Sequence, residues 1–328
     1  MKIEISSFIA QIRLGEVQSF QNMQVIPLFS DQEEELVYWT LKEALDKGLL
    51  LIQEVSSGGS VPELKVINQG DIPVLLLDGE EVAGAKQNRI LNTTILVKEK
   101  SEIIIPVSCT EQGRWSYRTK HFYDSGVVSP SFMRAQKTSA VNASLVQYRT
   151  YDSDQGAVWK DVRCLSKQME VESPTGAMRD VFEQKRDTLE DYIKAFNVVP
   201  SQKGILVFVD GEIAGCDIFS RTDVFEQIFP KLIKSYAMDS LIGDRRKITV
   251  SSNPQGEAAQ FLEEIKYCEE KRYFSPGWGA DYRFEGPDKV GTALVVEDQV
   301  IHMAVFKTKK EEKIDPMPGY RTRRGHRI

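Results

Sequence analysis

Residues 74–97 have the sequence VLLLDGEEVAGAKQNRILNTTILV, and this stretch decides the class of fold. An apolar run of strand length lies at each end of it, and turn residues and polar residues lie between the two runs. Similar short runs occur nearby, at residues 50–55, 64–68 and 102–108. The helices predicted elsewhere do not alternate regularly with these strands, so the sequence predicts an α+β fold.

The predicted strands and helices are distributed unevenly along the chain. Strands dominate residues 1–125, which we expect to form a β-rich domain, either a sandwich or a partial barrel, that carries the polar motifs. Residues 126–310 mix helices with hairpins and form either a second domain or a part packed on the same core. Residues 311–328 form a basic tail with four arginines, for which we expect a solvated chain end. These arginines are Arg321, Arg323, Arg324 and Arg327.

Hydrophobic spacing and turn residues give more detailed expectations. Strands are predicted at residues 8–14 and 23–28, and hairpins at residues 204–215 and 292–306. Helices are predicted at residues 32–47, 154–169, 177–196, 223–241 and 257–271. The Ser- and Thr-rich residues 138–144 and the segment 129–131 are predicted to be exposed loops.

Composition limits the classes of function. The 328 residues carry a formal charge of −6, which argues against a general nucleic-acid-binding surface. The four cysteines form no C-x-x-C pair, which is typical of reduced thiols in a reducing compartment. The N-terminus lacks the apolar core of a signal peptide, and no run approaches the roughly 20 apolar residues that span a bilayer. We therefore expect a cytoplasmic protein with no membrane partner, while the oligomeric state stays open.

Standard catalytic motifs are missing from the sequence. It contains no P-loop, no dinucleotide-binding glycine pattern, no H-E-x-x-H and no G-x-S-x-G. Only three histidines occur, which argues against a zinc enzyme, and no metal site is predicted. A Mg²⁺ ion held by one or two carboxylates and by substrate oxygens stays open as a cofactor.

Two short segments resemble each other. Asp78-Gly79 and Asp210-Gly211 each follow an apolar run and each precede an Ala-Gly pair. Asp-Gly is favoured in tight hairpin turns, which predicts a hairpin at each position. An ancient duplication is the alternative explanation for this similarity.

The most polar part of residues 74–97 follows the first of these turns. Lys86, Gln87, Asn88 and Arg89 are consecutive, and Asn92 follows, between strands that are otherwise apolar. A buried cation without a partner is very costly, so a carboxylate or a ligand anion should contact these side chains. An internal ion-pair network and a pocket for a phosphate or carboxylate are both open.

A second polar cluster follows the strand predicted at residues 102–108. Arg114 could hold an anion through two hydrogen bonds, and Trp115 could stack on a planar ring. Glu111 and Gln112 precede them, and Cys109 is a weak candidate for a nucleophile because no histidine is close in sequence. Since this strand should neighbour the strand at residues 90–97, we expect the two polar clusters to lie together.

These stretches resemble the ARG and rhodanese-phosphatase-superfamily-associated protein family, in which ARG stands for ADP-ribosylglycohydrolase. The similarity includes residues 75–92 and 105–115, Asp154-Gln155-Gly156 with Trp159, Pro174-Thr175-Gly176 and residues 235–239. The resemblance implies a role near NAD- or ADP-ribose-linked metabolism or defence and implies no particular reaction.

Three hypotheses follow. The first is a binding or sensing module for a small phosphorylated ligand, such as ADP-ribose or another NAD-derived nucleotide. Its predicted contacts are Lys86, Gln87, Asn88, Arg89, Asn92, Gln112, Arg114 and Trp115. The second is an enzyme acting on the same ligand class, with a carboxylate as general base or Mg²⁺ ligand. Its candidates are Glu80, Glu81, Glu111 and Asp217. The third is a structural or partner-binding protein whose polar clusters form an internal network.

Overall fold

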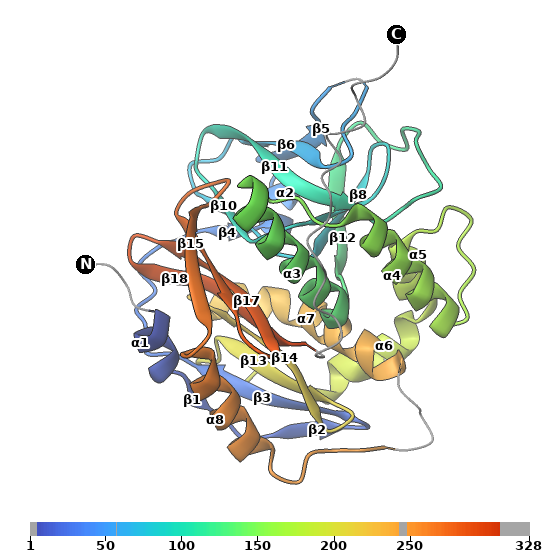
Figure 1. Ribbon diagram of the computed structural model, residues 1–328. Helices are drawn as coiled ribbons and strands as arrows, with labels where there is room; N and C mark the ends of the chain where they lie inside the picture. Colours follow the sequence, from blue (N-terminus) through green and yellow to red (C-terminus); the bar gives the residue numbers. More distant parts are fainter. Residues whose placement is uncertain (1–4, 57, 243–247, 309–328) are drawn as a thin grey trace.

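The computed structural model describes residues 5–56, 58–242 and 248–308. Helices hold 32% and strands 34% of the chain, and one antiparallel sheet curls into a half-barrel, which confirms the α+β class. In Figure 1 strands β5 (Leu50–Glu54), β6 (Glu63–Asn68) and β11 (Ser101–Cys109) lie at the upper end of the molecule. Strands β2 (Gln18–Phe20), β3 (Met23–Phe29) and β13 (Gly204–Val209) lie at the lower end. The basic tail predicted at residues 311–328 lies outside the described residues.

The largest sheet has nine strands in the described part of the chain and contains strands from both ends of the sequence. Its order is β1-β3-β13-β14-β18-β17-β16-β15, and β2 pairs with β3. The strands are β1 (Arg13–Leu14), β2 (Gln18–Phe20), β3 (Met23–Phe29), β13 (Gly204–Val209), β14 (Glu212–Phe219), β15 (Glu269–Phe274), β16 (Ala280–Glu285), β17 (Lys289–Val296) and β18 (Gln299–Lys307). The predicted strand at residues 23–28 and the hairpins at residues 204–215 and 292–306 are confirmed here.

Both faces of this sheet are buried. On β13, Ile205 and Val207 pack in one apolar cluster, whereas Leu206 and Phe208 pack in another. Alternate residues of a strand point to opposite faces, so the unbroken apolar sequence of β13 is what a strand covered on both sides requires.

Helices supply these covers. Helices α1 (Ile5–Ala10) and α8 (Pro254–Ile265) pack on one face, as Figure 1 shows at its lower left. The other face is covered by α3 (Ser131–Tyr148) and α7 (Thr222–Ile242). Beyond them lie α4 (Gln155–Gln168), α5 (Met178–Gln184) and α6 (Arg186–Ala195).

Two smaller sheets enclose a third apolar cluster together with α2 (Leu41–Asp46). The six-stranded sheet has the order β12-β8-β9-β11-β6-β5, and the three-stranded sheet has the order β10-β7-β4. Their strands are β4 (Trp39–Thr40), β5 (Leu50–Glu54), β6 (Glu63–Asn68), β7 (Val74–Leu76), β8 (Glu80–Gly84), β9 (Arg89–Leu91), β10 (Ile95–Val97), β11 (Ser101–Cys109) and β12 (Phe122–Val128).

The first predicted Asp-Gly hairpin is wrong, and the second is confirmed. Strand β7 pairs with β10 and β4, whereas β8 pairs with β9 and β12, so the two strands that flank Asp78 belong to different sheets. The Asp78 carboxylate is buried and forms an ion pair with Lys137 on α3. At the second site, Asp210 (φ 52°) and Gly211 (φ 79°) both adopt the positive φ of a tight hairpin turn.

A buried ionic network joins the small sheets to the large one through α3. Arg134 donates to both carboxylate oxygens of Asp217 on β14, at 3.0 and 2.6 Å. Its Nε lies 3.6 Å from Asp78, so one guanidinium contacts an acid from each part of the fold. His302 and Tyr236 complete the surroundings of Asp217, at 3.1 and 2.8 Å.

Several helix boundaries differ from the sequence prediction. Residues 138–144, predicted as a loop, belong to α3, and residues 5–10, partly predicted as a strand, form α1 because Ile5, Phe8 and Ile9 share one helix face. The helix predicted at residues 32–47 is shortened to α2, which begins at a capping box between Thr40 and Glu43. The helix predicted at residues 177–196 is split at Lys185, and that predicted at residues 257–271 gives way to β15.

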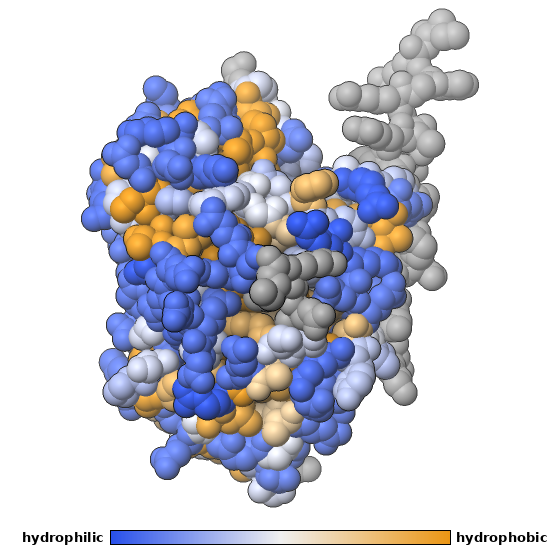
Figure 2. Space-filling model, turned by 90° about the vertical axis from the view of Figure 1, so that its left-hand side faces the viewer, coloured by the Kyte–Doolittle hydropathy of each residue, from blue (hydrophilic) through white to orange (hydrophobic). Residues whose placement is uncertain are grey.

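No described helix is both long and apolar enough to cross a membrane. On the face of the molecule in Figure 2, apolar side chains lie in separate groups among hydrophilic ones.

Candidate functional site

The loop between β8 and β9 carries the polar run that the sequence singled out. Lys86, Gln87 and Asn88 are each less than one-tenth exposed, and Arg89 is completely buried. Backbone hydrogen bonds attach this loop to the segment after β11, because the Thr110 N–H donates to Asn88 O at 3.1 Å. Strand β9 also pairs with β11, with Arg89 opposite Cys109. The two predicted clusters therefore lie together.

Arg114 is fully occupied by internal partners. Its Nε and Nη2 donate to the two carboxylate oxygens of Glu111, at 2.9 and 2.6 Å. Its Nη1 donates to the carbonyl oxygens of Ala85 and Ser116, at 2.6 and 2.8 Å. Burial alone would raise the pKa of Glu111, but hydrogen bonds from Arg114 and Thr175 hold that pKa below its usual value. This part of the cluster is an internal ion pair.

Arg89 is in the opposite situation. Its Nη1 donates to Gln87 Oε1 at 3.1 Å and to Asn88 O at 3.3 Å. Its Nε and Nη2 are buried and have no hydrogen-bond partner among the described residues. Burial lowers the pKa of Arg89, yet a guanidinium stays charged at neutral pH. The site thus holds a buried cation whose free N–H groups require an acceptor.

Cys109 does not neutralise this charge. Its thiol donates to Gln87 Oε1 at 3.2 Å and to Glu111 O at 3.4 Å. Burial raises the pKa of the thiol above its ordinary value of 9.0, although the neighbouring Arg89 acts in the opposite direction. A neutral thiol at physiological pH supplies no counterion for the guanidinium.

Two exposed aromatic rings cover the cations. The Lys86 ammonium lies 5.1 Å from the centre of the Trp115 ring and 5.3 Å from that of Tyr117, and the Arg89 guanidinium lies 5.8 Å from that of Trp115. Lys86 Nζ also donates to Gly58 O at 2.6 Å. Trp115 is 47% exposed and Tyr117 is 53% exposed, so both rings remain available for stacking.

A cavity of about 710 Å³ opens beside these rings. It is lined by residues 53–56 at the end of β5 and by residues 117–120, which include Arg118 and Lys120. Glu54 lines it with a carboxylate whose Oε1 accepts the Lys86 N–H at 3.3 Å. Its other oxygen, Oε2, is buried and has no partner among the described residues. Arg89, Lys86, Trp115, Tyr117 and Glu54 together form what we call the Arg89 site.

The sequence interpretation missed Glu54 and Tyr117. A signal for Glu54 was present, because Leu50, Ile52 and Glu54 alternate along β5 and all three are buried. Tyr117 follows Trp115 at a spacing of two, but the irregular segment between β11 and β12 gives no periodicity from which its direction could be predicted.

Other predicted ligand contacts have different partners. Asn92 donates to Tyr151 O at 2.9 Å and accepts from Ser108 at 2.5 Å. Asn88 accepts from the Gly84 N–H and from Arg114. Gln112 accepts from Arg163 at 2.9 Å. Gln87 donates to Glu111 O at 2.8 Å and orients Arg89. Gln87, Asn88 and Asn92 are thus buried internal contacts, whereas Gln112 is exposed.

The predicted catalytic carboxylates have separate partners, although Glu80 and Glu81 are neighbours on β8. Glu80 pairs with Lys231 at 2.5 Å, and Asp217 belongs to the buried network around Arg134. Glu81 accepts from Thr110 at 2.7 Å, and burial raises the pKa of Glu81 to about 7. No group of three or more metal-ligating side chains occurs within the described residues.

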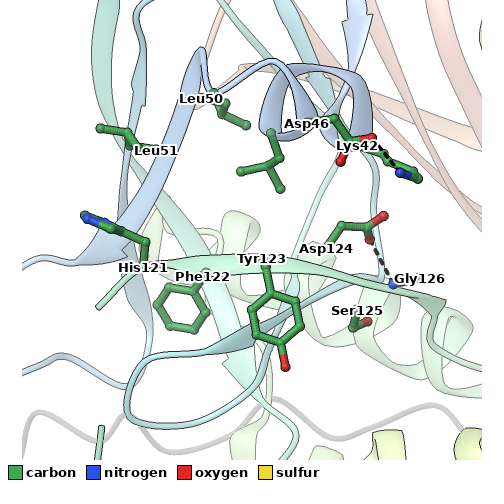
Figure 3. Close-up of a pocket in the computed structure, with 12 residues that line it drawn as sticks. Lys42, Asp46, Leu50, Leu51, His121, Phe122, Tyr123, Asp124, Ser125 and Gly126 are labelled. Atoms are coloured by element: carbon green, nitrogen blue, oxygen red, sulfur yellow. Dashed lines mark hydrogen bonds and ion pairs between the residues drawn. The ribbon is translucent and has the colours of Figure 1, made fainter. Parts of the chain in front are cut away.

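A second cavity, of about 550 Å³, lies between α2 and β12. Figure 3 shows that the charged groups of its wall already interact within the wall: Lys42 pairs with Asp46, and Asp124 accepts the Gly126 N–H. Asp124 is also paired with Lys231. The Arg89 site differs because Arg89 Nε and Nη2 and Glu54 Oε2 have no hydrogen-bond partner among the described residues.

A model of the ARPP-1 domain, described as the ARG and Rhodanese-Phosphatase-superfamily-associated Protein domain, matches residues 11–306. The chain belongs to the ARPP-1 family. This confirms the family resemblance, whose motifs at residues 75–92 and 105–115 contain Lys86, Arg89 and Trp115 of the Arg89 site. No curated protein and no solved structure matched the chain. The ARPP-1 match covers the large sheet and the two smaller sheets, so the Arg89 site lies within the matched family domain.

Proposed function

We propose that this chain binds a small phosphorylated ligand at the Arg89 site, with an ADP-ribose-like or other NAD-derived nucleotide as the leading class. The observation that carries the proposal is that two buried nitrogens of Arg89, Nε and Nη2, have no hydrogen-bond partner among the described residues. Phosphate oxygens accept hydrogen bonds from guanidinium groups through two parallel contacts, which matches a side chain with two unpartnered nitrogens.

The surroundings favour the same ligand chemistry. Lys86, Arg118 and Lys120 lie in or beside the cavity and add positive charge. Trp115 and Tyr117 offer exposed ring faces to an aromatic base. A cavity of about 710 Å³ is within the size range of small-molecule sites.

Binding is proposed ahead of catalysis because of the carboxylates. Glu80, Glu111 and Asp217 are each held in an ion pair, and none of them lines the open cavity. A general base has to reach the proton that it abstracts. The Glu111–Arg114 pair fits the third hypothesis, an internal network, but this pair does not account for Arg89.

The proposal is tested by calorimetric titration in phosphate-free buffer with ADP-ribose, AMP and inorganic phosphate, each with and without Mg²⁺. We expect saturable binding by the wild-type protein and its loss in Arg89→Met. Lys86→Met should weaken binding.

The matched control is Lys98→Met, because the Lys98 ammonium lies 4.7 Å from the centre of the Trp278 ring at another place on the surface. This variant removes an equivalent lysine–tryptophan contact and should bind as tightly as the wild type. Absence of binding across the panel, or equal weakening in the Lys86 and Lys98 variants, would refute the proposal.

A further inference from the structure

Glu54 is the second residue of the Arg89 site with a buried polar atom that has no hydrogen-bond partner among the described residues. This residue ends β5, is only 7% exposed and belongs to the wall of the larger cavity. The backbone N–H of Lys86 occupies Oε1, while Oε2 has no partner among the described residues. A buried carboxylate oxygen without a donor is as incomplete as a buried guanidinium without an acceptor.

Glu54 and Arg89 do not satisfy each other. Each influences the other electrostatically, and the negative charge of Glu54 favours the charged form of Arg89. They nevertheless form no ion pair within 4.0 Å, and each keeps vacant hydrogen-bonding atoms. The carboxylate of Glu54 only accepts hydrogen bonds, and the guanidinium of Arg89 only donates them.

The side chains of Trp115 and Lys86 lie close to Glu54 Oε2, as the surroundings of Gly59 show. A Cβ atom added at Gly59 would lie 3.3 Å from Glu54 Oε2, 3.2 Å from Trp115 and 3.1 Å from Lys86. These three side chains therefore converge at one point beside the cavity. A ligand that stacks on Trp115 would bring its neighbouring groups close to Glu54.

We infer that Glu54 accepts a hydrogen bond from a hydroxyl group that the ligand carries beside its anionic group, so the site prefers sugar phosphates over phosphates without hydroxyl groups. The inference rests on the proposed function of the same site. An anion alone would satisfy Arg89 but would be repelled by Glu54. A sugar phosphate supplies an acceptor for Arg89 and a donor for Glu54 at once.

Two probes separate the contributions: ribose 5-phosphate, and methyl phosphate, which carries the same anionic group and no hydroxyl. The wild-type protein should bind ribose 5-phosphate at least about tenfold more tightly, the usual effect of one hydrogen bond to a charged group. In Glu54→Gln most of this preference should disappear. Affinity for methyl phosphate should stay the same or rise, because a negative charge is removed.

The control is Glu102→Gln, which alters an exposed acid paired with Lys65 on the neighbouring strands and should leave both affinities unchanged. Thermal unfolding of each variant verifies that it is folded. The inference is wrong if the wild type binds both probes equally or if Glu54→Gln keeps the preference. Equal weakening of both probes by Glu54→Gln would also overturn it, while leaving the proposed function in place. Failure of the wild type to bind either probe would overturn the inference, whereas the titration with ADP-ribose and AMP decides the proposed function separately.

Discussion

Replacing Arg89 by Met should leave the ligand-free protein at least as stable as the wild type while it abolishes ligand binding. Buried side chains rarely behave in this way, because most core substitutions destabilise a protein. The expectation follows from the uncompensated charge. A completely buried guanidinium without an anion costs several kcal/mol of desolvation, and Met removes this cost while filling similar space.

The loss that opposes this gain is small. Arg89 donates two hydrogen bonds, to Gln87 Oε1 and to Asn88 O, each worth about 1 kcal/mol. Neither acceptor is left empty, because Gln87 Oε1 also accepts from Cys109 and Asn88 O also accepts from Thr110. The free energy of unfolding should therefore lie between no change and an increase of about 2 kcal/mol.

Arg114→Met is the matched comparison. Its Nε and Nη2 occupy both oxygens of the buried Glu111 carboxylate, so its removal leaves an anion without its principal partner. Breaking a buried pair in this way costs about 3–5 kcal/mol. The two arginines are close in space and similarly buried, yet the predicted changes have opposite signs.

Urea denaturation in phosphate-free buffer measures both free energies of unfolding. Adding ADP-ribose should then stabilise the wild type by mass action and leave Arg89→Met unchanged. If Arg89→Met destabilises the protein as much as Arg114→Met does, Arg89 is a structural residue and the reasoning fails.

Three further predictions concern groups outside this comparison. Cys164 is exposed and should react rapidly with a maleimide, whereas the buried thiol of Cys109 should react only after unfolding; mass spectrometry of tryptic peptides checks both. Burial raises the pKa of Glu81 to about 7 from 4.5, so the folded state loses stability as pH rises between these values. Glu81→Gln should gain stability relative to the wild type across that window, by up to about 3 kcal/mol in urea denaturation at each pH. Asp217→Asn should lower the free energy of unfolding by about 3–5 kcal/mol, because Arg134 loses its two-bond partner; a fully stable variant would contradict a structural role.

Strongly patterned elements were predictable from the sequence. The hairpin of β17 and β18 follows from two apolar runs around Glu297-Asp298, which both adopt positive φ. Helix α4 follows from Val158, Val162 and Leu165 on one face and from the Asp154 cap, whose side chain accepts the Ala157 N–H.

Helix α3 was missed for a physical reason. Its buried face contains Arg134, Lys137 and Thr138 besides apolar residues, since this helix carries the cations of the network between the sheets. Hydrophobic periodicity detects helices whose buried face is apolar, so a helix that buries charges resembles an exposed loop in sequence. Sequence pattern likewise predicts Asp78 in a hairpin turn and does not predict its buried ion pair with Lys137.

The candidate site was predictable in position and less so in composition. The pairing of β9 with β11 brings the two polar clusters together, as the sequence indicated. Which arginine lacks hydrogen-bond partners depends on long-range contacts. Examples are the bond from Thr175 to Glu111 and the bond from Arg114 to the Ala85 carbonyl. A single sequence without its fold does not distinguish Arg114 from Arg89.

The unpartnered nitrogens of Arg89 can be compared with the other buried cations of the molecule. Three other buried cations of the described chain pair with carboxylates: Arg134 with Asp217, Lys231 with Glu80 and Arg283 with Asp281. Arg89 differs from these cations because it has no carboxylate partner among the described residues. Glu54 is electrostatically coupled to Arg89 yet forms no ion pair with it, and both keep vacant atoms at the wall of a cavity or next to it. The proposed ligand would supply an acceptor to Arg89 and a donor to Glu54 at once.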